Sequence, residues 1–120
     1  GLFDRNQGNI AAANAERTGA EARRNAALAA AIRRTRDAQA ALRTAEAQLA
    51  FLENQAEPEA IEAVRIAREG FSAGRFTLLD VLDAEEALNT VQAAMITAEL
   101  ERAQAVAALT RASETEGSAR

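Results

Sequence analysis

The chain lacks cysteine, histidine, tryptophan and tyrosine, and it contains a single methionine among its 120 residues. Without cysteine it forms no disulfide, and without cysteine or histidine it lacks the usual nucleophile and base pairs of covalent catalysis. A transition-metal site would have to be built almost entirely from carboxylates, which disfavours tight binding of zinc or a softer metal. The composition therefore argues against an enzyme, a cofactor and a structural metal.

Helix breakers and aromatic rings are also scarce. The chain has one proline and six glycines, and aromatic residues make up 3% of it. Alanine, the best helix former, supplies most of the 48% hydrophobic content and adds little side-chain area to bury. Long helices in thin helix-on-helix contact fit this composition better than a thick globular core, so the sequence predicts an all-α fold.

Charge is divided unevenly along the chain. Residues 1–50 carry eight arginines and five acids, a net charge of +3, whereas residues 51–120 carry a net charge of −7. The arginines lie among acids along a predicted helix without interleaved aromatics, which disfavours a nucleic-acid surface. No signal peptide is visible, and no apolar run approaches the roughly 20 residues of a membrane-spanning helix. We expect no nucleic-acid partner and no direct membrane insertion by this segment.

A heptad pattern runs through the first half of the chain. After an irregular lead-in at residues 1–8, residues 9–69 are predicted to form one long helix. Its apolar or small residues recur at alternating steps of three and four, at Leu28, Ala31, Thr35, Ala38, Leu42, Ala45, Leu49, Leu52 and Ala56. So narrow a seam suits a coiled-coil partner, and its alanines let two backbones approach closely.

The single proline interrupts this helix. Pro58 lacks an amide hydrogen and clashes with the carbonyl one turn earlier, so we expect a kink or a new helix start near Glu57. Beyond it the stripe is predicted to resume at Ile61, Val64, Ala67 and Phe71.

A tight reversal is predicted at residues 70–77. Gly70 and Gly74 stand four residues apart, and Thr77 can act as the N-cap of a helix that begins at Leu78. The returning helix, residues 78–112, carries its own stripe, and the polar tail, residues 113–120, is expected to fray. The stripe comprises Val81, Ala84, Leu88, Val91, Met95, Ala98, Val106 and Leu109. The sequence thus predicts a long antiparallel, coiled-coil-like helical hairpin.

Two segments resemble a known family. Phe-Asp-Arg-Asn-Gln-Gly-Asn-Ile-Ala-Ala-Ala at residues 3–13 is similar to the stretch where TolC-type outer-membrane factors, the outer membrane efflux proteins, enter a long periplasmic helix. Gly-Phe-Ser-Ala-Gly at 70–74, with Thr-Leu-Leu-Asp-Val-Leu-Asp-Ala at 77–84, resembles the periplasmic tip of these ducts. Phe71 departs from the family's more frequent tyrosine and keeps the ring. The Asp-Arg-Asn-Gln-Gly version is similar to the branch that serves cobalt, zinc and cadmium cation pumps.

The resemblance implies one hairpin of a periplasmic α-barrel. Members of the family form a homotrimer in which each protomer supplies four barrel strands and long helices to an exit duct. This duct stands above a periplasmic adaptor and an inner-membrane pump. No segment of the chain shows the alternating pattern of a barrel strand. We therefore expect a fragment from the periplasmic part of a bacterial outer-membrane protein, and in isolation it can self-associate differently from the native trimer.

The resemblance also implies a pore constriction at Asp80 and Asp83. These acids lie three residues apart on one helix face, and in the family acids at these positions form rings of negative charge that attract cations. The alternative is that both carboxylates only stabilise the N-terminus of the returning helix, where the helix dipole favours anions.

The turn itself is predicted to contact the adaptor. By the resemblance, the contacting residues are Gly70, Gly74, Arg75, Phe76 and Thr77, with Gly74 permitting a close backbone approach. The alternative is that Gly74 serves only as a turn residue with positive φ.

A different class of function also fits the helical pattern. A free-standing cytosolic coiled-coil scaffold that binds protein partners accounts equally well for the alanine-rich heptads. It does not account for the Asp-Arg-Asn-Gln lead-in or for an acidic pair directly after a two-glycine turn.

Overall fold

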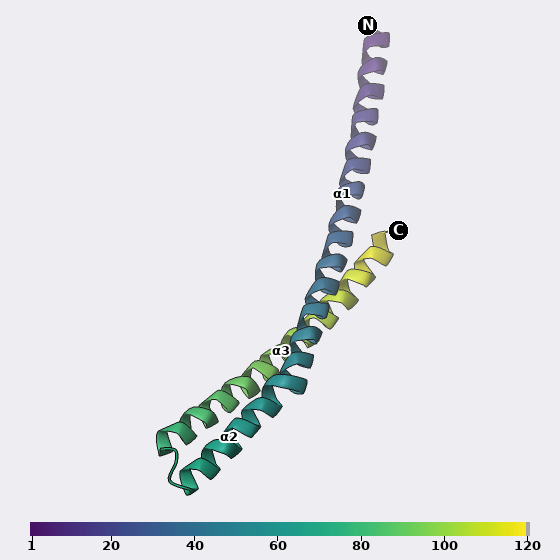
Figure 1. The fold of residues 1–120 in the computed structure, drawn as a ribbon. Helices are drawn as coiled ribbons and strands as arrows, with labels where there is room; N and C mark the ends of the chain where they lie inside the picture. Colours follow the sequence, from purple (N-terminus) through teal and green to yellow (C-terminus); the bar gives the residue numbers. More distant parts are fainter. Residues whose placement is uncertain (120) are drawn as a thin grey trace.

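The structure, a computed structural model, describes residues 1–119 and is a long helical hairpin (Figure 1). Helix α1 spans Leu2–Phe51, the π-helix η1 spans Leu52–Ala56, α2 spans Glu57–Ser72 and α3 spans Leu78–Ala119. No strand occurs in this part of the chain, and the Cα atoms extend over 104 × 23 × 14 Å. The predicted all-α antiparallel hairpin is confirmed.

Both ends of the hairpin are more helical than the sequence analysis predicted. Helix α1 begins at Leu2, so residues 2–8 are helical and not an irregular lead-in. Helix α3 continues beyond residue 112 to Ala119, and Arg120 lies outside the described residues. Extending an existing helix adds one hydrogen bond for each residue fixed, so polar residues without a proline continue it readily.

Alanines form the seam between α1 and the C-terminal half of α3. Ala31, Ala38 and Ala45 of α1 are buried at intervals of seven residues. On α3 the buried alanines have the same interval, at Ala98, Ala105 and Ala112. A seam of such small side chains brings the two backbones close, as the heptad pattern predicted for α1. Val106 is 48% exposed, so the prediction that it lies in the α3 stripe was wrong, and its neighbour Ala105 takes that place.

A wide helical turn precedes the single proline. In η1 the Glu57 N–H donates to the Leu52 carbonyl, five residues back, and Pro58 lies in the first turn of α2. Because proline has no N–H and its ring collides with the carbonyl four residues earlier, widening this turn accommodates it without ending the helix. The predicted disturbance near Glu57 is thus a π-turn, and the long arm curves as it passes from α1 into α2 (Figure 1).

The π-turn also changes the spacing of the seam. Buried residues follow every seven positions up to Leu52, but the next in the series is Ala60, eight positions on, followed by Ala67. The earlier prediction placed Ile61 and Phe71 in the stripe, whereas they are 52% and 46% exposed. Val64 and Ala67 are buried as predicted, whereas the buried positions on either side of them are Ala60 and Gly70 and not Ile61 and Phe71.

The two arms of the hairpin have unequal lengths. The buried seam starts at Ala31 of α1 and ends at Ala112 of α3. Residues 2–27 of α1 are exposed except for the partly covered Gly19, and the N-terminal turns of α1 extend beyond the end of α3 (Figure 1). Leu2 and Phe3 are 85% and 86% exposed on this extension.

Candidate functional site: the hairpin tip

Helix α2 ends in a Schellman motif centred on Gly74. Gly74 has φ of 72°, a left-handed conformation that favours glycine. The Arg75 N–H donates to the Gly70 carbonyl at 2.7 Å, and the Gly74 N–H donates to the Phe71 carbonyl at 3.0 Å. These two bonds satisfy carbonyls that the end of the helix would otherwise leave without partners. The chain therefore reverses over a few residues with little freedom.

Helix α3 begins with a capping box formed by Thr77 and Asp80. The Asp80 N–H donates to Thr77 Oγ1 at 3.2 Å, and Asp80 Oδ2 accepts from the Thr77 N–H at 2.7 Å and from its hydroxyl at 2.8 Å. The bond from the Thr77 N–H, and then the one from its hydroxyl, lower the pKa of the Asp80 carboxyl below its ordinary value. Thr77 is thus at the N-cap position suggested by the sequence, and Asp80 holds the first turn of α3.

Asp83 differs from Asp80 in its contacts. It lies one turn further along α3 and is exposed, and no hydrogen bond or ion pair to it occurs within residues 1–119. The three-residue spacing places it on the same side of α3 as Asp80. Of the two predicted constriction residues, Asp80 is engaged in the helix cap and Asp83 has its carboxylate free.

Gly70 lies under the ring of Phe76. A Cβ atom added to Gly70 would stand 2.6 Å from Cε2 of Phe76 and would also overlap Cδ2 and Cγ, whereas a Cβ on Gly74 would meet only open space. Gly70 is buried, and its carbonyl accepts from Phe76 N–H at 3.2 Å in addition to Arg75 N–H. Among the predicted contact residues, Gly74, Arg75, Phe76 and Thr77 are exposed and Gly70 is not.

Large apolar side chains surround the turn and remain partly open to solvent. Phe71 and Phe76 are 46% and 45% exposed, and Leu78, Leu79 and Leu82 are 55%, 64% and 51% exposed. A patch of this kind at the end of an extended molecule is typical of a surface that meets another protein. Between Glu69 and Asp80 the only charged residue is Arg75, which has no ion-pair partner among the described residues.

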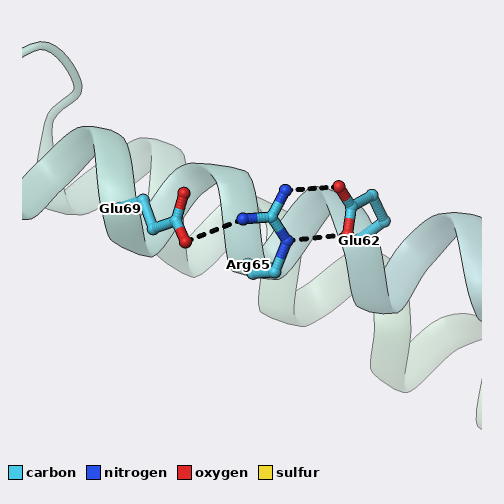
Figure 2. Close-up of polar contacts among 3 residues, drawn as sticks. All are labelled: Glu62, Arg65 and Glu69. Atoms are coloured by element: carbon cyan, nitrogen blue, oxygen red, sulfur yellow. Dashed lines mark hydrogen bonds and ion pairs between the residues drawn. The ribbon is translucent and has the colours of Figure 1, made fainter.

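Ion pairs fill the surface above the turn. Arg65 of α2 donates to both oxygens of Glu62, at 2.8 and 2.5 Å, and to Glu69 at 2.7 Å (Figure 2). The hydrogen bond from Arg65 lowers the pKa of Glu62, and its two partners raise the pKa of Arg65. Arg68 joins α2 to α3 through Glu85 at 2.6 Å. These pairs are exposed, so each stabilises the hairpin only slightly.

The net charge is concentrated in the half of the hairpin that contains the tip. Residues 52–97 carry three arginines and nine acids, a net charge of −6. Residues 2–51 and 98–119, which form the opposite half, carry ten arginines and nine acids, a net charge of +1. The tip half therefore attracts cations, most strongly at low ionic strength.

Helix α3 carries a second apolar stripe on the side opposite to its seam. Leu79 and Leu82 are exposed near the start of α3, and Ile96, Leu100, Ala103 and Ala107 continue the same side two heptads further on, with Glu86, Asn89 and Ala93 at the positions between. At about 100° per residue, this stripe points nearly opposite to the seam series of Ala84, Val91, Ala98 and Ala105, of which the first two are partly buried and the last two buried. A helix with two opposed apolar stripes is suited to lie between two neighbouring helices.

Among residues 1–119, no helix has both the length and the apolar character needed to cross a bilayer.

A hydrogen-bonded turn at the end of an extended hairpin, with outer faces that remain partly apolar, defines a class of protein, the elongated helical hairpins with surface left for further helices. The family model of the outer membrane efflux proteins matches residues 1–113, and the chain belongs to this family. The chain has no significant match among the curated proteins or the solved structures. Family membership agrees with the resemblance seen at residues 3–13 and 70–84, and it favours the efflux interpretation over a cytosolic scaffold.

Two features of the tip were missed by the sequence analysis. The first is the packing of Phe76 on Gly70, six residues earlier. This contact depends on the Schellman geometry, and no local sequence pattern predicts it. The sequence analysis considered Asp80 as a stabiliser of this helix N-terminus through the dipole but not its hydrogen bonds with Thr77, which could have been found because Thr77 followed by an acid three residues later is a capping-box pattern.

Proposed function

We propose that this chain is a wall segment of the periplasmic exit duct of a tripartite efflux pump and that its tip docks the pump's adaptor. The observation that carries the proposal is the pair of opposed apolar stripes on α3. One stripe packs on α1 and α2 within the hairpin, and the other, at Leu79, Leu82, Ile96 and Leu100, is left for a helix outside it. In a closed ring of helices every member has two neighbours, so each needs two such faces.

In this proposal the intact protein is a homotrimer in the outer membrane, and this hairpin is part of its periplasmic tunnel. The N-terminal part of α1, before the seam begins, also has a stripe of small residues in alternating steps of three and four, at Ala12, Ala15, Gly19, Ala22, Ala26 and Ala29. The duct catalyses no reaction, and an inner-membrane pump supplies the energy. The chain binds no cofactor.

The proposed cargo is a heavy-metal cation. The negative charge of the tip half and the Asp-Arg-Asn-Gln-Gly segment at residues 4–8 support this choice. Three copies of Asp83 brought close together around the duct axis repel one another and attract cations, which makes an electrostatic filter. Asp80 adds its charge to the same side of α3 while it holds the helix cap.

Conductance of the purified trimer in a lipid bilayer tests the filter. The double variant Asp80→Asn with Asp83→Asn is expected to lose block by a divalent cation, and Asp83→Asn alone is expected to account for most of the loss. Asn keeps an acceptor oxygen at residue 80 and can therefore retain part of the cap. Glu53→Gln is the matched control, since Glu53 is exposed and lies in η1, away from the tip. Unchanged block in the double variant would remove the filter from the proposal.

Adaptor docking is proposed at the exposed turn formed by Gly74, Arg75, Phe76 and Thr77. These residues form the turn between α2 and α3, at the end of the hairpin away from both termini (Figure 1). Exposed apolar side chains flank this turn, and Arg75 has no ion-pair partner among the described residues. A helical-hairpin tip with apolar residues and a carboxylate would match this surface.

Two substitutions at Gly74 separate contact from turn geometry. Asn tolerates the left-handed conformation of residue 74, whereas Val does not. If the adaptor approaches the backbone here, both Gly74→Asn and Gly74→Val should abolish crosslinking of the adaptor to the intact trimer. Normal crosslinking of Gly74→Asn, with loss only in Gly74→Val, would show that Gly74 serves the turn alone.

A further inference from the structure

The tip turn is held from both of its ends. On the α2 side the Gly70 carbonyl accepts the N–H groups of Arg75 at 2.7 Å and Phe76 at 3.2 Å. On the α3 side Thr77 and Asp80 exchange three hydrogen bonds. Arg75 lies between these two anchors, so the position of its backbone is defined before any partner arrives.

The contact between Phe76 and Gly70 closes this arrangement. The ring occupies the space that a Cβ of residue 70 would fill, and it covers the buried end of the seam. The same ring lines an open groove with Ala63, Ile66, Ala67 and Asp80. Among the described glycines only Gly74 has a positive φ, so residue 70 needs no glycine for its backbone conformation. Glycine is required at residue 70 because a side chain there would collide with the Phe76 ring.

We propose that Phe76, seated on Gly70, is the positioning residue that holds the tip in its docking conformation. Gly70 then acts from beneath the surface and makes no direct contact with a partner. A turn already ordered before binding loses less conformational entropy on association, so the preformed tip binds the adaptor faster and more tightly than a mobile one. This inference rests on the proposed docking of the adaptor at the tip.

The test combines a structural and a functional measurement on the intact trimer. Phe76 is replaced by 4-fluorophenylalanine, and its fluorine resonance reports the order and surroundings of the ring without any partner. Gly70→Ala is expected to shift and broaden this resonance because its Cβ displaces the ring. The association rate with the purified adaptor is then measured for the unlabelled variants.

Gly70→Ala and Phe76→Ala are each expected to slow association about tenfold, and the double variant is expected to be no slower than either one, because both remove the same contact. Phe76→Tyr keeps the ring and should associate at the parent rate. Phe76→Ala adds no atoms to the turn, so it tests the proposal even if Gly70→Ala fails to assemble. Trimer yield should be unchanged in all variants, which a general loss of folding would not allow.

Three results would overturn the positioning role. The first is a fluorine resonance that Gly70→Ala leaves unchanged, the second is a double variant whose slowing equals the product of the two single effects, and the third is a parent association rate in Phe76→Ala. Failure of the proposed function has a different signature, because the parent trimer itself would then not bind the adaptor at all.

Discussion

The two halves of the hairpin hold their helices together by different means. Between α1 and the C-terminal half of α3 the buried residues are alanines, such as Ala31, Ala38 and Ala105, which are between 0% and 6% exposed. Towards the tip larger residues enter the seam, including Val64 and Val81, and an ion pair between Arg68 and Glu85 joins the arms. The first half depends on close backbone approach, whereas the second depends on side-chain volume and on the geometry of its turn.

This difference indicates a division of labour. A seam of alanines keeps the two helices close together and leaves no space for larger side chains, since added atoms would force the backbones apart. The tip half has exposed apolar residues and most of the net negative charge, which are the properties needed to meet partners and cations. The π-turn η1 lies where the two halves join.

The largest effect is expected from removing the extra residue at this junction. Gln55 is exposed, and deleting it shortens the step from Leu52 to Ala60 to seven residues. The chain then lacks the extra residue that forms the wide turn. Pro58 would then lie inside a regular α-helix, which costs about 3 kcal/mol. Thermal unfolding followed by circular dichroism should show this loss, and adding Pro58→Ala should restore most of it. No rescue by Pro58→Ala would mean that the wide turn is not an accommodation of the proline.

The second largest effect is expected from enlarging the alanine seam. Ala98 is 1% exposed and packs with Leu49 and Leu52, so Ala98→Leu should reduce the free energy of unfolding by about 1–3 kcal/mol. The same change at the exposed Ala87 is the control and should cost far less. Equal effects at both sites in a denaturant titration would contradict the close approach of the two helices.

Acid should weaken the tip half before the alanine seam. The folded pKa of Asp80 lies below the unfolded value, so its stabilising contribution is present above about pH 4 and is lost as the pH falls below it towards the lowered folded pKa. Glu62, whose pKa is also lowered, acts in the same direction. Thr77→Ala removes the partner of Asp80 only, so its stability should fall less with acid than that of the parent. Identical pH profiles between pH 5 and 2 would refute the assignment of Asp80 to the cap.

The smallest effect is expected at the Glu62–Arg65–Glu69 cluster (Figure 2). All three side chains are more than half exposed, so Arg65→Gln should lower the unfolding midpoint less than the substitutions in the seam. The difference from the parent should disappear in high salt, because exposed charges are screened. A large loss that persists in high salt would show that the cluster does more than solvate the surface of α2.

Much of the fold could be predicted because it repeats a short pattern. All nine predicted seam residues of α1 and η1 are buried or partly buried, and the returning helix begins at Leu78 as expected. Beyond Leu52 the prediction was correct for Val64 and Ala67 and wrong for Ile61 and Phe71, because the eight-residue step across η1 becomes visible only when the spacing of both arms is compared in three dimensions. Val106 was predicted to lie in the stripe of α3, whereas the close approach of the helices buries the smaller Ala105 instead.

The candidate site was predictable in its members and less so in their roles. The glycines and Thr77 were recognised as turn residues, and both acids were placed on one helix face. Their roles depend on contacts across the turn, such as the Phe76 ring on Gly70, and these follow from the path of the backbone between residues 70 and 77.

The eight-residue step across η1 has a consequence for anyone who exchanges parts between ducts of this kind. The arm formed by α1, η1 and α2 contains one residue more than a regular seven-residue repeat. A chimera joined by residue number alone would therefore rotate every side chain from Glu57 to Ser72 by about 100° around the helix axis. Ala60 and Val64 would then face water, and their exposed neighbours would be forced against α3. Splice points in such hybrids should be chosen by matching buried alanines on the two arms, with the wide turn carried intact in one donor.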